Sequence, residues 1–236
     1  MKKILYILLV AIIVLSLTGC TISKERMLEK SKKIYVDELR EELEVNFKKA
    51  KKKYKGNIYE IDAGVISIEE DFAKIALGDY GFYDKEYLEV HFKDKDLEKL
   101  KVGERITFVG KISDISKEDN YIKVKIKKAH YISNIMKITG YFKKSYEEHC
   151  FSTLGGICSY ATVCSFHDKK NEYISYEYNY GHDDCDILYD LDIDEYEEVN
   201  VEAKMEVSYY RDDNNFMIFH DEWDIDIISI ENRKIT

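Results

Sequence analysis

The sequence contains no proline and only one tryptophan, whereas tyrosine is common, with 20 among 236 residues. This composition is typical of strand-rich chains. Three catalytic motifs are also absent: there is no nucleophile elbow, no Gly-rich phosphate loop and no His-Glu-x2-His zinc motif. The histidines at 91, 130, 149 and 220 stand apart in the sequence without an evident partner. We therefore expect no enzymatic activity, no catalytic residues and no cofactor.

The sequence also lacks an apolar run long enough to cross ~30 Å of hydrocarbon comfortably as a helix. Its N-terminus has two lysines, an apolar run over residues 4–17 and then Leu17-Thr18-Gly19-Cys20. This arrangement predicts a signal peptide, and the last four residues resemble the lipobox of bacterial lipoproteins. The resemblance implies a signal peptide over residues 1–19, lipidation of Cys20 and a protein anchored outside the cytoplasm to the bacterial cell membrane. An uncleaved membrane anchor with a chance cysteine is the alternative.

Charge is distributed unevenly around a formal net charge of −10. Residues 23–55 carry an excess of basic residues, residues 56–134 are slightly acidic, and residues 135–236 are strongly acidic. An acidic C-terminal half repels phosphate backbones, so nucleic acid is disfavoured as a partner. The basic part of the chain directly follows the predicted lipid anchor.

Residues 23–54 contain neither glycine nor proline and predict one long N-terminal helix, within a lipid-anchored segment 20–55. Its apolar positions form one stripe at spacings of three, four and seven residues: Leu28, Tyr35, Leu39, Leu43, Phe47, Ala50 and Tyr54. We expect the C-terminal half of this helix to pack on the following domain. Six lysines between 48 and 55 gather where the helix dipole favours cations. They either contact anionic lipid or wall polymer, or form a solvated last turn.

Residues 56–134 predict a small Greek-key barrel. Strands are expected at 57–68, with a bend at Gly64, and at 73–77, 87–92, 105–112 and 121–132, with a short helix at 94–100. In the last strand, apolar residues at 122, 124 and 126 alternate with lysines at 123, 125 and 127, which places the lysines outside. Five strands with a helix between the third and fourth is the order of an OB barrel. Such barrels commonly bind across strands two and three, so residues 73–92 are the first place to expect a ligand.

Two motifs in this region carry a family resemblance. They are Asn46-x3-Ala50-x3-Tyr54-Lys55-Gly56, followed by Gly-Val-Ile-x-Ile at 64–68, and Leu97-x2-Leu100-Lys101-Val102-Gly103-x6-Val109-Gly110-Lys111-Ile112. Over residues 37–132 the sequence resembles the tRNA_anti-like OB-fold family of bacterial envelope proteins. The resemblance implies an OB fold but carries over no catalytic residues, and the absence of a cysteine pair in this barrel implies no disulfide there.

Residues 135–236 predict a second, acidic and cysteine-containing β domain, for which an OB-like barrel and a single mixed β extension are the alternatives. Gly140 lies in an opening strand similar to that of the first barrel. The alternation at 199, 201, 203, 205, 207 and 209 is the cleanest in the chain, and a turn at 212–215 leads to a last strand ending at 230. The fold class is therefore mostly β, with an N-terminal helix, an OB-fold Greek-key barrel and this second domain.

Four cysteines remain when Cys20 is set aside: Cys150, Cys158, Cys164 and Cys185. Outside the cytoplasm an even number predicts two disulfides, with three possible connectivities. Reduced core cysteines are one alternative. A zinc site of Cys164, His167, His182 and Cys185 is another, although this order matches no familiar zinc module. A calcium loop at Asp190, Asp192 and Asp194 is disfavoured, because the glycine and the glutamate that such a loop needs are missing.

These features together predict a lipid-anchored, extracytoplasmic binding or interaction protein. Its partners are expected to be the membrane, through the lipid, and a protein or an envelope polymer. An envelope enzyme, or a receptor for a metal or small ligand, is the alternative, with its site in the Cys- and His-rich insertion at 149–185.

Overall fold

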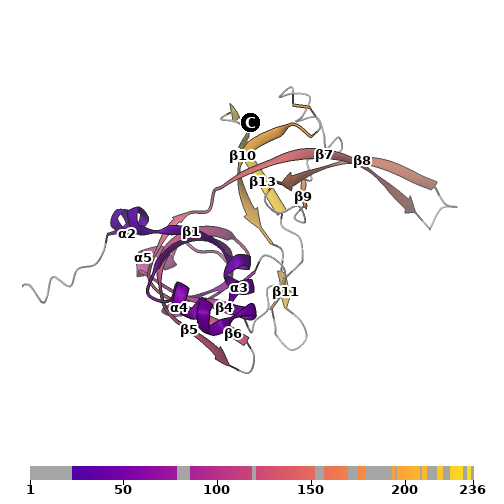
Figure 1. Ribbon diagram of the computed structural model, residues 1–236. Helices are drawn as coiled ribbons and strands as arrows, with labels where there is room; N and C mark the ends of the chain where they lie inside the picture. The colour runs from indigo at the N-terminus through magenta and orange to yellow at the C-terminus, as the bar shows by residue number, and fades with distance from the viewer. Residues whose placement is uncertain are drawn as a thin grey trace, which may run out of the picture.

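The computed structural model describes residues 23–78, 86–118, 121–151, 157–169, 175–178, 193–194, 196–207, 209–211, 217–219, 224–230 and 233–234. The chain is mostly β, as expected (Figure 1). Its helices are α2 (Lys24–Lys30), α3 (Val36–Val45), α4 (Phe47–Tyr54) and α5 (Asp94–Leu97). The strands of the N-terminal half are β1 (Lys32–Tyr35), β2 (Ile58–Ile68), β3 (Ala73–Ala76), β4 (Tyr87–Phe92), β5 (Arg105–Glu118) and β6 (Tyr121–Ser133). Those of the C-terminal half are β7 (Met136–Phe151), β8 (Ile157–Asp168), β9 (Ser175–Tyr178), β10 (Glu198–Glu206), β11 (Tyr209–Arg211), β12 (Met217–Phe219), β13 (Asp224–Ile230) and β14 (Arg233–Lys234).

Five strands of the N-terminal half close into a barrel. Their order is β2-β3-β4-β6-β5, and an additional β2–β5 pairing completes the ring. All neighbours are antiparallel except β4 and β6, which run parallel. The expected strands and their order are confirmed, and the order is consistent with an OB-like barrel.

Glycine placement explains two features of this barrel. At Gly64 strand β2 ends its pairing with β5, and from Val65 onward it pairs with β3, so the expected bend marks a change of partner. Gly103, in the turn before β5, has a φ of 84°, in the left-handed region that glycine adopts without steric cost. This turn therefore has a backbone conformation that its glycine permits.

The barrel core is built from alternating strand positions, including Ile61, Leu88, Phe108 and Val124, each with 0% of its surface exposed. Helices α3 and α4 pack against this core (Figure 1). Their inward residues Leu39, Leu43, Ala50 and Tyr54 belong to the same buried cluster. The expected packing of the C-terminal part of the N-terminal segment on the barrel is thus confirmed.

The expectation of one continuous helix over residues 23–54 is wrong. Helix α2 ends at Lys30, and the chain then forms β1, which pairs parallel with residues Tyr59 to Asp62 of β2. A second break occurs at Asn46, whose side chain accepts a hydrogen bond from the Lys49 amide at 3.2 Å and caps α4. The pairing of β1 buries Ile34 in the barrel core, a long-range contact that outweighs the helical spacing.

The C-terminal half forms a second sheet of six strands in the order β14-β13-β10-β7-β8-β9, with every neighbouring pair antiparallel. The predicted alternation is confirmed in β10, where Val199, Val201, Ala203 and Met205 are buried. When β7, β8, β9, β10 and β13 are numbered one to five in chain order, their order across the sheet is three, two, one, four, five. The five barrel strands, numbered in the same way, have this order when the ring is opened between β4 and β6. Strands β9 and β13 lie in contact, although they are not paired.

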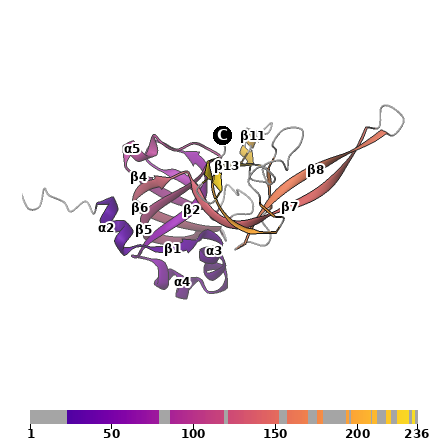
Figure 2. The same ribbon diagram turned by 90° about the horizontal axis from the view of Figure 1, so that it is seen from above.

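Strands β7 and β8 form a long two-stranded arm that extends away from the barrel (Figures 1 and 2). At the base of the arm, Gly140 allows the two strands to approach closely, because a Cβ there would lie 2.1 Å from the carbonyl oxygen of His167. The barrel and the second sheet meet where the Val207 amide donates to the Gly103 carbonyl at 2.8 Å. The turn that contains Gly103 therefore also contacts the second half of the protein.

Candidate functional site

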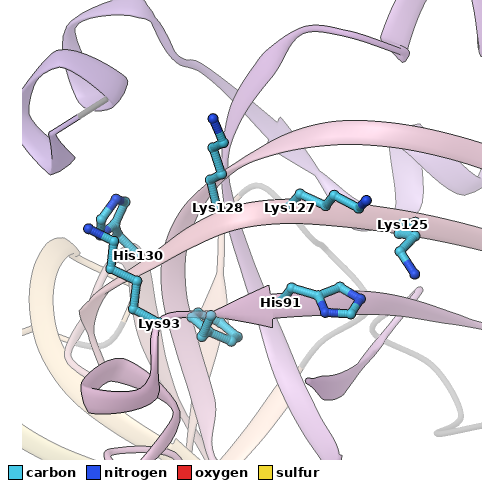
Figure 3. A pocket seen from close by; sticks show the side chains of 7 residues that line it. His91, Lys93, Lys125, Lys127, Lys128 and His130 are labelled. Atoms are coloured by element: carbon cyan, nitrogen blue, oxygen red, sulfur yellow. The ribbon is translucent and has the colours of Figure 1, made fainter. Parts of the chain in front are cut away.

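A pocket of about 370 Å³ lies on the outer surface of the barrel, where β4 and β6 run side by side (Figure 3). The end of β4 contributes His91 and Phe92, and Lys93 follows directly. The other lining residues come from β6: Lys125, Lys127, Lys128 and His130. Four lysines and two histidines therefore line one cavity on a protein whose net charge is −10.

A β-bulge in β6 brings two of these lysines to the same surface. Val90 and Phe92 of β4 face Ile126 and Ala129, so β6 uses three residue steps where β4 uses two. The pairing between β5 and β6 shows the same extra residue in β6. Lys128, at the bulge, has a φ of 57°, a left-handed conformation that is costly for a residue with a Cβ.

The bulge changes which residues point outward. Ile122, Val124 and Ile126 are buried in strict alternation, but Lys127 and Lys128 are both exposed before burial resumes at Ala129. A regular strand would place consecutive residues on opposite faces. Bulges often occur beside functional sites, where they redirect side chains. This local distortion therefore concentrates positive charge on the outer face.

Glu89 partly neutralises one side of the pocket. Its carboxylate accepts a hydrogen bond from the Lys125 ammonium and lies 2.7 Å from Nε2 of His91. Partial burial of Glu89 favours its neutral form, but the hydrogen bonds from Lys125 and His91 outweigh this effect and lower the pKa of Glu89. Lys125 is thus already paired with a carboxylate.

The remaining lysines of the pocket are not neutralised in this way. Within the described part of the chain, Lys93, Lys127 and Lys128 make no ion pair or side-chain hydrogen bond. All three side chains are exposed. The pocket therefore presents three uncompensated ammonium groups, a local charge that favours an anion.

His130 lines the same pocket but is buried, with 7% of its side chain exposed. Its Nδ1 lies 3.6 Å from the carboxylate of Asp96 on α5, and that carboxylate also pairs with Lys99 at 2.9 Å. No group in the described residues forms a hydrogen bond with its Nε2. Buried polar atoms are almost always hydrogen-bonded, so this nitrogen is an exception that calls for an explanation.

The sequence located this pocket only in part. The expected ligand region, residues 73–92, supplies His91 and Phe92, whereas most of the lining comes from β6. His91 and His130, which lack partners in the sequence, are brought to one cavity by the parallel pairing of their strands. The available signal was the doubled lysine at 127 and 128, which interrupts the alternation of β6.

The lysine run at the end of α4 has a different role. Lys53 pairs with Glu42 at 2.6 Å, and Lys55 pairs with Asp114 of β5 at 2.6 Å. Lys51 donates to the carbonyl of Ile115. Half of the run therefore fastens α4 to α3 and to the barrel, a role that neither expectation for these lysines included.

The cysteine predictions fall largely outside the described residues. This holds for Cys20, for Cys185 and His182, and for Asp190 and Asp192 of the disfavoured calcium loop. Three other candidates lie on described strands: the backbone register places Cys150 directly opposite Cys158, and Cys164 opposite Lys144. The disulfides and their connectivity stay predictions.

His167 is the one zinc candidate whose side-chain contacts are described. It stacks on Tyr141 with a centroid distance of 5.2 Å, and its Nε2 lies 2.8 Å from the Ser165 hydroxyl. Burial lowers its pKa, and the charge of Lys143 lowers it further. Among the described residues, no group of three or more potential ligands could hold a metal ion.

No protein-family model and no curated protein matches this sequence. In the part of the chain that the structure describes, no helix is long and apolar enough to cross a membrane.

Proposed function

We propose that this protein is a lipid-anchored, extracytoplasmic and non-enzymatic binding protein that captures an anionic ligand in the basic pocket of its barrel. The lipobox resemblance of residues 17–20 supports the anchor and the location. The closed strand order supports an OB fold for residues 56–134, in agreement with the tRNA_anti-like resemblance. The repeated strand order of β7, β8, β9, β10 and β13 supports a second OB-like barrel rather than a mixed β extension.

One observation carries the ligand assignment: a strained bulge places uncompensated lysines around a cavity. A surface lysine run without function would be free to alternate with the strand, as Lys123 and Lys125 do. The backbone at Lys128 instead adopts an unfavourable conformation that adds a cation to one face. Strain of this kind clusters at functional sites. The size of the cavity is within the range of small-ligand sites, about 300–1,000 Å³.

Anion binding can be tested by retention of the full-length protein, in neutral detergent, on a phosphate-bearing cation-exchange resin at pH 7. The double variant Lys127→Glu/Lys128→Glu should elute at lower salt than the wild type. The matched control is Lys48→Glu/Lys52→Glu, an equal charge change at two exposed lysines of α4. If the control shifts elution as much as the pocket variant, only net charge is being measured and the pocket assignment is wrong.

The anchor is tested separately by metabolic labelling with a palmitate analogue. Cys20→Ala should lose both the label and the mature size, whereas Cys150→Ala should retain them. Label that persists in Cys20→Ala would contradict the lipoprotein assignment.

A further inference from the structure

We propose that the anion captured by the basic pocket is the phosphate of an anionic phospholipid, in the membrane that carries the lipid anchor of this protein. The inference rests on the proposed function and names the ligand of the same pocket. Three features lead to it: the free charge around the pocket, the place where α2 is attached to the barrel, and the short connection from that place to Cys20.

The free lysines of the pocket suit a phosphate on a surface. Lys127 and Lys128 are adjacent on the bulge, Lys93 follows the neighbouring strand β4, and all three side chains are exposed (Figure 3). Lysine binds phosphate as a point charge, so it needs no rigid and enclosed cradle. A membrane that contains anionic lipids attracts each lysine near its surface, and the attraction grows with the number of lysines in a cluster.

Two carboxylates beside the pocket are already occupied by other cations. Glu89 of β4 accepts a hydrogen bond from Lys125, and Asp96 of α5 pairs with Lys99 at 2.9 Å. They therefore leave the free ammonium groups uncompensated. An anion that approaches this face of the barrel meets an excess of positive charge.

Helix α2 is attached to the strand that supplies most of the pocket lining. The ammonium of Lys24, in the first turn of α2, donates to the carbonyl oxygen of Tyr131 at 2.8 Å. Tyr131 directly follows His130, which lines the pocket from β6. Figures 1 and 2 show α2 at the end of the barrel that lies away from the β7–β8 arm. The arm therefore does not separate α2 from the pocket.

The connection from α2 to the predicted lipid is short. Cys20 precedes Lys24 by four residues, a span of at most about 14 Å even in a fully extended chain. Lipid chains on Cys20 would hold α2, and with it the adjoining part of β6, close to the headgroup layer. A short tether raises the effective concentration of the groups that it brings together. The phosphates of that layer are therefore the anions that the pocket meets most often.

The test measures how fast individual lysines of the lipidated full-length protein react with a neutral acetylating reagent. The protein is reconstituted in vesicles of phosphatidylcholine, with or without phosphatidylglycerol, and acetylation of each lysine is followed by mass spectrometry. Phosphatidylglycerol should slow the acetylation of Lys127 and Lys128 about fivefold, the effect of the attraction of one lysine to an anionic surface. Lys48 and Lys52, which are exposed on α4 outside the pocket, should react at the same rate in both vesicles. Equal slowing of all four lysines would overturn the inference, because it reports only the general field of the membrane.

A charge reversal tests whether the lysines act together on one headgroup. In Lys127→Glu/Lys128→Glu, the remaining lysine of the pocket, Lys93, should lose its protection by phosphatidylglycerol. The control Lys48→Glu/Lys52→Glu changes the net charge by the same amount and should leave Lys93 protected. Loss of this protection in both variants would overturn the assignment of the headgroup to the pocket.

The failure of this inference is distinguishable from failure of the proposed function. Inorganic phosphate is titrated against the wild type in phosphatidylcholine vesicles, and acetylation of Lys127 and Lys128 is measured again. Protection by inorganic phosphate without protection by phosphatidylglycerol would overturn the lipid inference and leave the anion pocket in place. Protection by neither would overturn both proposals.

Discussion

Replacing Lys128 by glycine tests whether the bulge is kept for binding rather than for stability. A side chain in the left-handed region costs roughly 1–2 kcal/mol, a cost that glycine avoids. Glycine also gains freedom in the unfolded chain, which costs roughly 0.5–1 kcal/mol. Since Lys128 has a φ of 57°, Lys128→Gly should leave the free energy of unfolding unchanged or raise it by up to about 1.5 kcal/mol.

Lys127 provides the matched control. Lys127 is exposed like its neighbour, and its replacement by glycine removes the same charge, but its φ is negative. Lys127→Gly therefore relieves no strain and should lower the free energy of unfolding by roughly 0.5–1 kcal/mol. The two variants should differ by about 1–2 kcal/mol, which corresponds to about 0.5–1 M in the urea midpoint.

Both variants should nevertheless lose affinity for inorganic phosphate, by roughly five- to tenfold, because each removes one charged hydrogen-bond donor. Urea unfolding followed by circular dichroism and calorimetric titration measure the two quantities on the same samples. A Lys128→Gly variant that is destabilised as much as Lys127→Gly would refute the strain argument. One that binds the phosphate as well as the wild type would refute the role of Lys128 in the pocket.

Three further substitutions test the fold and the electrostatics. Gly140→Ala should destabilise the second sheet by about 1–3 kcal/mol, since its Cβ would overlap the carbonyl oxygen of His167; an unchanged melting temperature would contradict this. Leu43→Ala should cost about 2–5 kcal/mol in chemical denaturation, because this residue of α3 is fully buried in the barrel core; a loss below 1 kcal/mol would detach the helix from that core. Glu89→Gln should strengthen phosphate binding by releasing Lys125, and weaker binding would argue against this. Because the folded-state pKa of Glu89 is lowered, its ionised form stabilises the fold above its unfolded pKa. The stability advantage of the wild type over this variant should shrink as pH falls through the folded pKa, as urea titrations at several pH values would measure.

The strands and their order could be inferred from the sequence, because the two-residue alternation of apolar and polar positions in a strand is visible in the sequence alone. The alternation around Val124 and Val201 is local information, and so is the glycine that permits the turn at 103. These elements appear where they were expected. The two halves were also separable by charge and by the recurrence of an opening strand that contains a glycine.

Long-range contacts decided what the local pattern could not. Residues 23–54 have helical spacing throughout, yet β1 forms because β2 offers an unpaired edge beside Tyr59, where Ile34 can be buried. The pocket has the same origin. His91 and His130 are 39 positions apart in the sequence, and only the parallel pairing of β4 with β6 places them around one cavity. The sequence by itself therefore determined the barrel, and the tertiary structure decided where that barrel concentrates its charge.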